Sequence, residues 1–231
     1  MAPASLLSSK QSVSLEPLRE PRSGSLLAFT ALGFERDDVP LFSNVTDSVA
    51  PGEILQIAGG NGCGKTTLLR ILTTALRATE GCLYWRGQAV EHQKAEYLAE
   101  LVFAGHAAGI KLALTPEENL SWLARVYPVR EQDITSALIR VGLAGREDMP
   151  CHTLSAGQQR RVVLARLLVA RAALWILDEP MTAIDQEGVA LLEGILQEHT
   201  ERGGAVILSS HQTLSFDGVR LLELSEYGAR D

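Results

Sequence analysis

Three short, mostly apolar runs predict the strands of a buried sheet. They are Ile54–Ala58, Ala173–Leu177 and Ala205–Leu208. Strands covered by helices on both faces lack the polar alternation of a half-exposed strand, so runs of this kind are typical of parallel sheets in α/β proteins. We expect Ala205–Leu208 to be the final strand of the chain.

Helical spacing and capping residues predict helices between these runs. Apolar residues recur at helical spacing over residues 65–76. Residues 115–118 read Thr-Pro-Glu-Glu, which supplies an N-cap, a proline at the first helical position and a capping-box glutamate. Ser155 and Gln158 have the same capping-box spacing ahead of a wide apolar face. The stretch 95–103 fits a helix or a strand.

The N-terminal part divides into an extension and a β region. Residues 1–24 are rich in Ser and Pro and show no sustained period, so we expect a loose extension without the apolar core of a secretory signal. Strands are expected at 26–29 and 41–45, with a turn at Asp37-Asp38, and a further strand at 82–85.

One glycine-rich segment fits the phosphate-binding loop pattern G-x-x-x-x-G-K-[ST] at every fixed position. Its residues are Gly59, Gly60, Asn61, Gly62, Cys63, Gly64, Lys65, Thr66 and Thr67. The segment lies between a predicted strand and a predicted helix, the context that the motif requires. There, backbone N–H groups and the lysine would hold phosphate oxygens, and Thr66 would bind Mg²⁺ through its hydroxyl. An ordinary glycine-rich turn is the weaker alternative.

Carboxylates and a histidine follow two of the apolar runs. Asp178 and Glu179 come directly after Ala173–Leu177, and His211 follows Ala205–Leu208. Ligands of parallel sheets bind at the carboxyl ends of the strands. We therefore expect Asp178 to reach the Mg²⁺ held by Thr66 and Glu179 to face an attacking water, with the histidine at the same edge.

Two further features are less specific. The helix N-terminus that begins at Ser155, with the Gly157 backbone, could hold an anion, although any capped helix would look similar. Phe34 could stack on a purine ring or belong to the core of the predicted hairpin.

Charge, cysteine content and hydropathy argue against several classes of function. A formal net charge of -7 over 231 residues, without a basic stripe, argues against a nucleic-acid partner. Cys63, Cys82 and Cys151 form neither a metal-ligand spacing nor an even disulfide set, which favours a reducing compartment. No stretch approaches the ~18 uncharged apolar residues of a membrane span.

The order of these motifs resembles the ATP-binding subunits of ABC transporters, over residues 25–223. The resemblance implies one ATPase domain at 25–231 with a phosphate-loop α/β core, a mixed sheet flanked by helices, an antiparallel N-terminal β part and a helical lobe at about 112–158. It implies ATP and Mg²⁺ as cofactors. For nucleotide binding, the resemblance implies that Phe34 stacks on adenine and that residues 59–67 are the Walker A loop. It implies that residues 154–158, with Ser155, Gly157 and Gln158, are the family signature. It assigns metal binding to Thr66 and Asp178, and catalysis to Glu179, His211 and Lys65.

The chain departs from the family pattern at two places. Ala156 replaces the first glycine of the usual signature, and no glutamine stands at the Q-loop position, which falls on His106 or Ala107. In the family, a serine and the second glycine of the signature contact phosphate. The substitution at Ala156 therefore spares the signature residues that contact phosphate. The missing glutamine leaves undecided which residue of the Q-loop senses the metal ion and the interface.

Within the family, the chain is most similar to the ATPase subunits of cytochrome c maturation, or haem export, systems. The similarity includes Gly105-His106, Gly109–Lys111, the signature helix and the early end after His211. It implies a peripheral protein on the cytoplasmic face of the bacterial inner membrane, with integral membrane subunits as partners and haem delivery to a periplasmic chaperone as its purpose.

The resemblance also implies that two copies of the chain share each nucleotide, between Lys65 of one copy and Ser155 of the other. Three alternatives remain open at this point. They are the ATPase of another ABC transporter, a soluble ABC ATPase that acts on a cytosolic complex, and a regulatory nucleotide-binding module without turnover.

Overall fold

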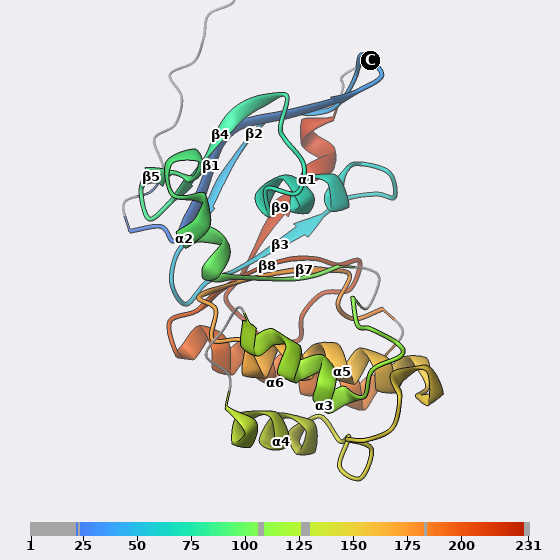
Figure 1. Cartoon of the computed structure of the whole chain (residues 1–231). Helices are drawn as coiled ribbons and strands as arrows, with labels where there is room; N and C mark the ends of the chain where they lie inside the picture. The colour runs from blue at the N-terminus through green and yellow to red at the C-terminus, as the bar shows by residue number, and fades with distance from the viewer. Residues whose placement is uncertain (1–21, 23, 106–108, 126–129, 183, 229–231) are drawn as a thin grey trace, which may run out of the picture.

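The computed structural model describes residues 22, 24–105, 109–125, 130–182 and 184–228, which form two sheets (Figure 1). The first sheet is antiparallel, with strand order β2-β1-β4-β5. Its strands are β1 Leu27–Arg36, β2 Val39–Val49, β4 Glu80–Trp85 and β5 Gln88–Ala89. The predicted hairpin is confirmed, because β1 and β2 pair antiparallel and the chain turns at Asp37 and Asp38.

The second sheet carries the three apolar runs. Its order is β6-β7-β8-β3-β9, and the neighbouring strands described in it pair in parallel. Its strands are β3 Ile54–Ala58, β6 Leu101–Ala104, β7 Leu174–Asp178, β8 Ala205–Ser209 and β9 Val219–Glu223. The predicted α/β fold class, with helices flanking the sheet and an antiparallel N-terminal part, is confirmed.

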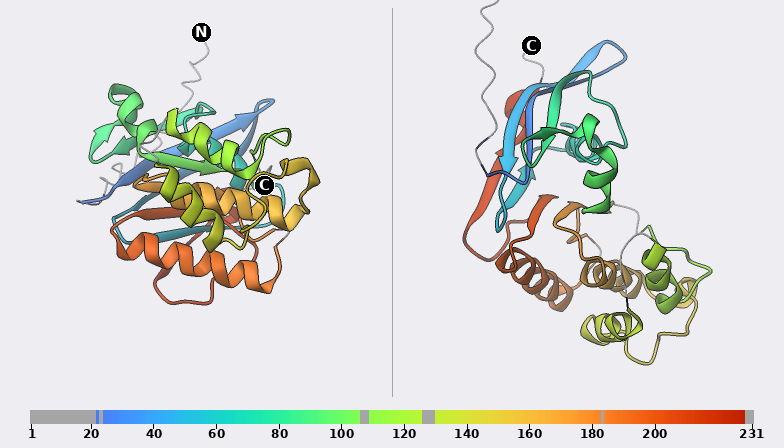
Figure 2. Two further views of the ribbon diagram at one scale, coloured as in Figure 1. Left: turned by 60° about the horizontal axis from the view of Figure 1, so that its bottom comes forward. Right: turned by 60° about the vertical axis from the view of Figure 1, so that its left-hand side comes forward.

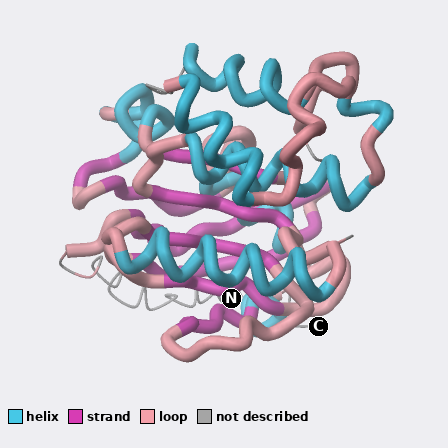
Figure 3. Tube along the Cα trace, turned by 90° about the horizontal axis from the view of Figure 1, so that it is seen from below, coloured by secondary structure: helices cyan, strands magenta, loops and turns pink. Residues whose placement is uncertain are grey.

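Helices cover this parallel sheet on both faces (Figures 1 and 3). The α-helices are α1 Lys65–Leu72, α2 Lys94–Ala99, α3 Pro116–Ser121, α4 Glu131–Arg140, α5 Ala156–Val169 and α6 Gln186–Glu201. Single 3-10 turns are η1 Val90–His92, η2 Trp122–Arg125, η3 Cys151–Thr153 and η4 Leu224–Tyr227. Helix α1 lies between the two sheets, whereas α3 to α6 lie on the other side of the parallel sheet (Figures 1 and 2).

Alternate residues of each central strand point into two separate cores. In β7, Leu174 and Ile176 join the core around α1, whereas Trp175 and Leu177 join the core around α5 and α6. Because both faces are covered, no position along β7 can be polar until the strand ends. This explains why the run Ala173–Leu177 shows no alternation.

Three predictions about elements need correction. The ambiguous stretch 95–103 is both a helix and a strand, since it contains most of α2 and the start of β6. Helix α1 ends at Leu72, four residues before the predicted end. Ala205–Leu208 is not the final strand, because β9 follows it and pairs with β3 at the edge of the sheet. The sequence of β9 mixes polar and apolar residues, as an edge strand permits.

The predicted helical lobe, residues 112–158, contains α3, η2, α4 and η3. The capping box at Thr115 is confirmed, with the threonine hydroxyl accepting from the Glu118 N–H at 3.1 Å. Helix α4 packs into the core through Ile134, Ala137 and Leu138, and its Arg140 forms an ion pair with Glu198 of α6. The boundary of the lobe stays a prediction.

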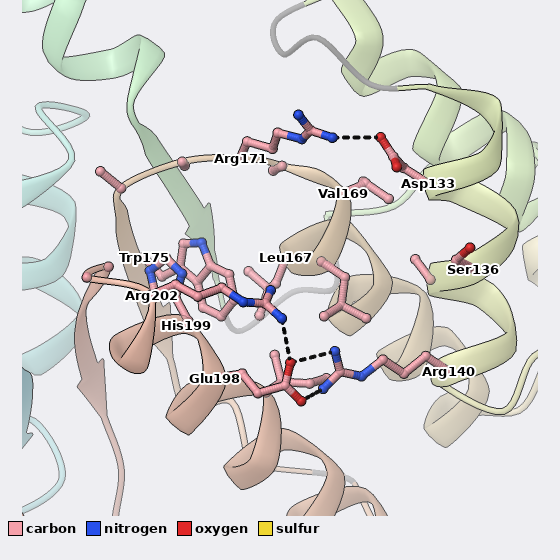
Figure 4. A pocket seen from close by; sticks show the side chains of 18 residues that line it. Asp133, Ser136, Arg140, Leu167, Val169, Arg171, Trp175, Glu198, His199 and Arg202 are labelled. Carbon is pink, nitrogen blue, oxygen red and sulfur yellow. Dashed lines mark hydrogen bonds and ion pairs between the residues drawn. The ribbon is translucent and has the colours of Figure 1, made fainter. Parts of the chain in front are cut away.

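A cavity of about 590 Å³ lies between α4, the end of α5 and the end of α6 (Figure 4). The rings of Trp175 and His199 stack inside it, with centroids 3.7 Å apart. Gly204 packs so closely on His199 that a Cβ there would lie 2.2 Å from the imidazole Nε2. Burial lowers the pKa of His199 to about 4, so the ring is neutral in the folded protein at neutral pH.

The neutral His199 predicts a stability loss in weak acid. Between pH 6.5 and about 4 the unfolded chain binds a proton at this histidine that the folded chain does not, so the free energy of unfolding falls as the pH falls. The pKa difference corresponds to at most about 3 kcal/mol, and solvent screening lowers that figure. In urea unfolding at several pH values, His199→Gln should flatten this slope and the exposed control His92→Gln should not. A wild-type slope in His199→Gln would contradict the assignment.

Candidate active site

The phosphate-binding loop connects β3 to α1, and its backbone needs glycine at defined points. Gly64 is the N-cap of α1 with φ of 103°, a left-handed conformation. A Cβ at Gly64 would lie 2.9 Å from side-chain carbons of Leu41 and Phe42 in β2. The loop therefore packs directly on the antiparallel sheet, and a side chain at this position has no room.

Lys65 lies inside this loop and is 8% exposed. Its ammonium group donates to the carbonyls of Gly59 at 2.8 Å and Gly60 at 3.3 Å. A cation in a concave surface next to a helix N-terminus is suited to bind phosphate oxygens. The location of Lys65 agrees with its predicted role.

The predicted metal-binding residues are in contact. The Thr66 hydroxyl donates to Asp178 Oδ2 at 2.9 Å, across the gap between α1 and the end of β7. Asp178 is 2% exposed. A hydroxyl and a carboxylate side by side are hard oxygen ligands of the type that Mg²⁺ binds, with its remaining positions left for phosphate and water. The residues present therefore fit the predicted metal ion.

Ser209, at the end of β8, is a site residue that the sequence analysis missed. Its hydroxyl donates to Asp178 Oδ1 at 2.7 Å and accepts from the Glu179 N–H at 2.9 Å. Parallel pairing places Asp178 opposite Ser209. The sequence signal was that Ser209 is the first residue after the run Ala205–Leu208, just as Asp178 is the first residue after the run Ala173–Leu177. The two residues therefore lie at the same edge of a parallel sheet.

The predicted catalytic residues meet at one point. His211 Nε2 lies 3.4 Å from Glu179 Oε1 and 3.4 Å from Lys65 Nζ. Glu179 has φ of 50°, a left-handed conformation that is unfavourable for a residue with a side chain. Backbone strain of this kind often marks functional positions. The turn after β7 thus directs the Glu179 carboxylate toward the histidine.

A buried arginine holds that turn from the side of the signature helix. Arg160 of α5 donates to the carbonyls of Glu179 at 2.9 Å and Pro180 at 3.3 Å. Burial lowers the pKa of its guanidinium, with the nearby Asp178 opposing that shift. The sequence analysis missed Arg160 because a charged residue in an apolar helix usually faces solvent.

A cavity of about 450 Å³ opens above the loop. Its lining includes eight of the predicted site residues, namely Glu179, His211 and the loop residues Asn61, Gly62, Gly64, Lys65, Thr66 and Thr67. Arg36, Leu41 and Thr182 also line it and were not predicted. The predicted site residues Gly59, Gly60, Cys63 and Asp178 are not among the lining residues.

Phe34 does not line this cavity. Its ring packs toward Phe42, at a centroid distance of 6.5 Å, and it lines a neighbouring hollow with Tyr227. Arg36, two residues further along β1, is the residue that borders the phosphate-loop cavity. Adenine stacking by Phe34 therefore stays a prediction, and Arg36 is a second candidate for the contact with the base.

The signature residues lie on a different surface. Ser155 Oγ accepts from the Gln158 N–H at 3.2 Å, and Gln158 Oε1 accepts from the Ser155 N–H at 3.0 Å, so the capping box is confirmed. Ser155, Gly157 and Gln158 do not border the phosphate-loop cavity of their own chain. The predicted Q-loop positions, His106 and Ala107, fall outside the described residues.

Comparison with known proteins agrees with this geometry. A family model described as "ABC transporter" matches residues 42–182. The "Cytochrome c biogenesis ATP-binding export protein CcmA" of Pseudomonas fluorescens is 52% identical over 82% of this chain and 90% of its own length. The protein with the same name from Hahella chejuensis is 49% identical over 86% of this chain and 95% of its own.

The fold is likewise shared with a solved structure. A putative ABC transporter ATP-binding protein from Pyrococcus furiosus superposes with a TM-score of 0.77 at 28% identity, over 88% of this chain and 99% of that one. The loop, the carboxylates and the histidine thus occur together in a chain that matches this family in sequence and in fold. The chain belongs to the ABC transporter family.

Proposed function

We propose that this protein is the ATP-hydrolysing subunit of an ABC-type complex in the bacterial inner membrane. The complex serves cytochrome c biogenesis by exporting haem or by delivering it to a periplasmic chaperone. The observation that carries the proposal is the meeting of Lys65, Glu179 and His211 beside the Thr66–Asp178 pair. This site occurs in a chain 52% identical to a cytochrome c biogenesis ATP-binding export protein.

Each residue has a distinct part in hydrolysis. Lys65 and the loop N–H groups bind the phosphates of ATP, while Thr66 and Asp178 hold Mg²⁺, which supplies charge stabilisation to the phosphoryl group. Glu179 orients the attacking water and accepts its proton, and His211 lies close enough to both Glu179 and Lys65 to link the base to the phosphate end.

A second copy of the chain completes the site. Ser155 and Gly157 present a capped helix N-terminus but do not border their own phosphate-loop cavity. A head-to-tail pair of chains would bring this N-terminus to the nucleotide bound by the other copy, as the resemblance implies. Closure of that pair would then couple ATP to the movement of a membrane partner.

Membrane subunits contact the surface around Lys111 in this proposal. The Lys111 ammonium lies 4.3 Å from the centroid of the Trp122 ring, which is 46% exposed. Asn119 fixes the Lys111 backbone through its Oδ1 and Nδ2 atoms. Within the described ranges no helix is long and apolar enough to cross a bilayer. In this proposal the chain attaches peripherally, on the cytoplasmic face, through its contact with the membrane subunits.

The contact with the adenine base can be assigned by two substitutions. If Arg36 contacts the base, Arg36→Ala should weaken ATP binding about three- to fivefold, as expected for loss of one exposed cation–π contact. Phe34→Ala should then leave ATP affinity within twofold, because its ring lies outside the cavity. Fluorescence titration with ATP analogues measures both. The reverse ranking would establish Phe34 as the stacking residue.

Loss of the base should stop turnover without loss of binding. Glu179→Gln should reduce ATP hydrolysis by about a hundredfold or more at unchanged ATP affinity, while Glu96→Gln on the exposed face of α2 should have no effect. Cells with only Glu179→Gln should make normal apocytochrome c and little haem-attached product. A haem stain beside an immunoblot for the apoprotein checks this. Normal holocytochrome c without hydrolysis would contradict the haem function and leave the ATPase assignment standing.

Charge reversal tests the membrane contact. Lys111→Glu should release the chain from membranes that contain its partner subunits, because a charge at the rim of an interface controls association. Its fold and ATP affinity should not change. Lys94→Glu, at another exposed lysine on α2, is the matched control. Equal membrane retention of both variants after fractionation would show that partners contact another surface.

A further inference from the structure

The C-terminal segment of the chain lies against the phosphate-binding loop. Strand β9 runs parallel to β3, and its last residue, Glu223, is paired with Ala58. Two parallel strands that end in register deliver their next residues to the same edge of the sheet. As a result, η4, which begins at Leu224, starts beside Gly59 and Gly60, the first residues of the loop.

Contacts at atomic distance join the two segments. The Ser225 hydroxyl accepts a hydrogen bond from the Gly60 N–H at 3.3 Å. A Cβ on Gly59, whose φ is 140°, would lie 2.6 Å from Cys63 Sγ, 3.0 Å from Ser225 Oγ and 3.2 Å from Glu223 Oε1. The start of the loop is therefore enclosed between its own Cys63 and the C-terminal segment.

One peptide group connects Ser225 to Lys65. The carbonyl of Gly59 and the N–H of Gly60 belong to the same planar peptide unit and point in opposite directions. The N–H side donates to Ser225, and the carbonyl side accepts from the Lys65 ammonium at 2.8 Å. Because the unit is planar, holding its N–H also fixes the direction of the carbonyl that contacts the lysine.

Ser225 is itself held in place. Its backbone N–H donates to Glu223 Oε1 at 3.4 Å, and Glu223 caps η4. The neighbouring Leu224 is fully buried in the core around α1, whereas Ser225 is exposed. Removal of the Ser225 hydroxyl therefore opens no cavity, so a substitution there tests the hydrogen bond alone.

We propose that Ser225 is a positioning residue of the nucleotide site: by holding the Gly59–Gly60 peptide it keeps the first half of the phosphate loop, and with it Lys65, in the geometry that receives phosphate. Ser225 acts through the loop and touches no reacting atom. It therefore sets the affinity for nucleotide and leaves the chemical step to Glu179. The inference rests on the ATP-binding role proposed above.

The test asks whether Ser225→Ala changes the affinity for nucleotide without changing the turnover rate. Loss of one neutral hydrogen bond to the loop should raise the Kd of Mg²⁺–ATP about fivefold in Ser225→Ala, and KM should rise equally. The kcat at saturating ATP should stay within twofold of wild type. Ser225→Thr keeps the hydroxyl and should restore wild-type affinity. Ser136→Ala, which removes an exposed hydroxyl of α4, is the matched control.

Amide hydrogen exchange, measured without nucleotide, supplies a second readout. Peptides that contain Gly59–Cys63 should exchange several times faster in Ser225→Ala than in wild type, while peptides from α4 and the Tm stay unchanged. Unchanged Kd and unchanged loop exchange in Ser225→Ala would overturn the inference, and so would a loss of kcat at constant Kd. If the wild-type chain failed to bind ATP, the proposed function would fall, whereas loop exchange would still decide whether Ser225 holds the loop.

Discussion

The site depends on the hydrogen bonds of one buried carboxylate, that of Asp178. It accepts from Thr66 of α1 on one oxygen and from Ser209 of β8 on the other, so three separate elements meet at a side chain that is 2% exposed. A buried charge is costly unless it is hydrogen-bonded or paired, and here two hydroxyls and the nearby Arg160 guanidinium compensate it. The parallel pairing of β7 with β8 brings these groups to one edge of the sheet.

The same edge is tied to the helical side of the molecule through α5. Ser155 caps this helix at its start, and Arg160, little more than one turn later, donates to the carbonyls of Glu179 and Pro180. A shift of α5 along or about its axis would therefore move the turn that carries Glu179, the proposed catalytic carboxylate. The left-handed backbone of Glu179 makes that turn sensitive to such a movement, because an unfavourable conformation persists only while its surroundings hold it.

Features with a local cause could be read from the sequence. The capping boxes at Thr115 and Ser155 depend on residues three apart, and the loop motif depends on consecutive residues. Strand β9 was missed because an edge strand tolerates polar residues such as Arg220, which pairs with Asp47 of β2 at 2.5 Å. The sequence could not place Phe34 and Arg36, because register shifts on both sides of Phe34 alter which way β1 side chains point. The hydrogen bonds that join Ser209, Arg160 and Ser225 to the site link residues more than 15 positions apart, so no local pattern reveals them.

Binding and catalysis share their charges in this arrangement. The Lys65 ammonium is satisfied by two loop carbonyls and lies 3.4 Å from His211, which lies equally close to Glu179. A phosphate group competes for the lysine against neutral carbonyls, and charged hydrogen bonds are roughly twice as strong as neutral ones. A phosphate bound in the cavity would therefore draw the ammonium away from the Gly59 and Gly60 carbonyls. His211 lies close to both the lysine and the glutamate, so a displacement of the ammonium would also change the surroundings of Glu179. If Glu179 is the base, as proposed, nucleotide binding and the position of the base would then be coupled.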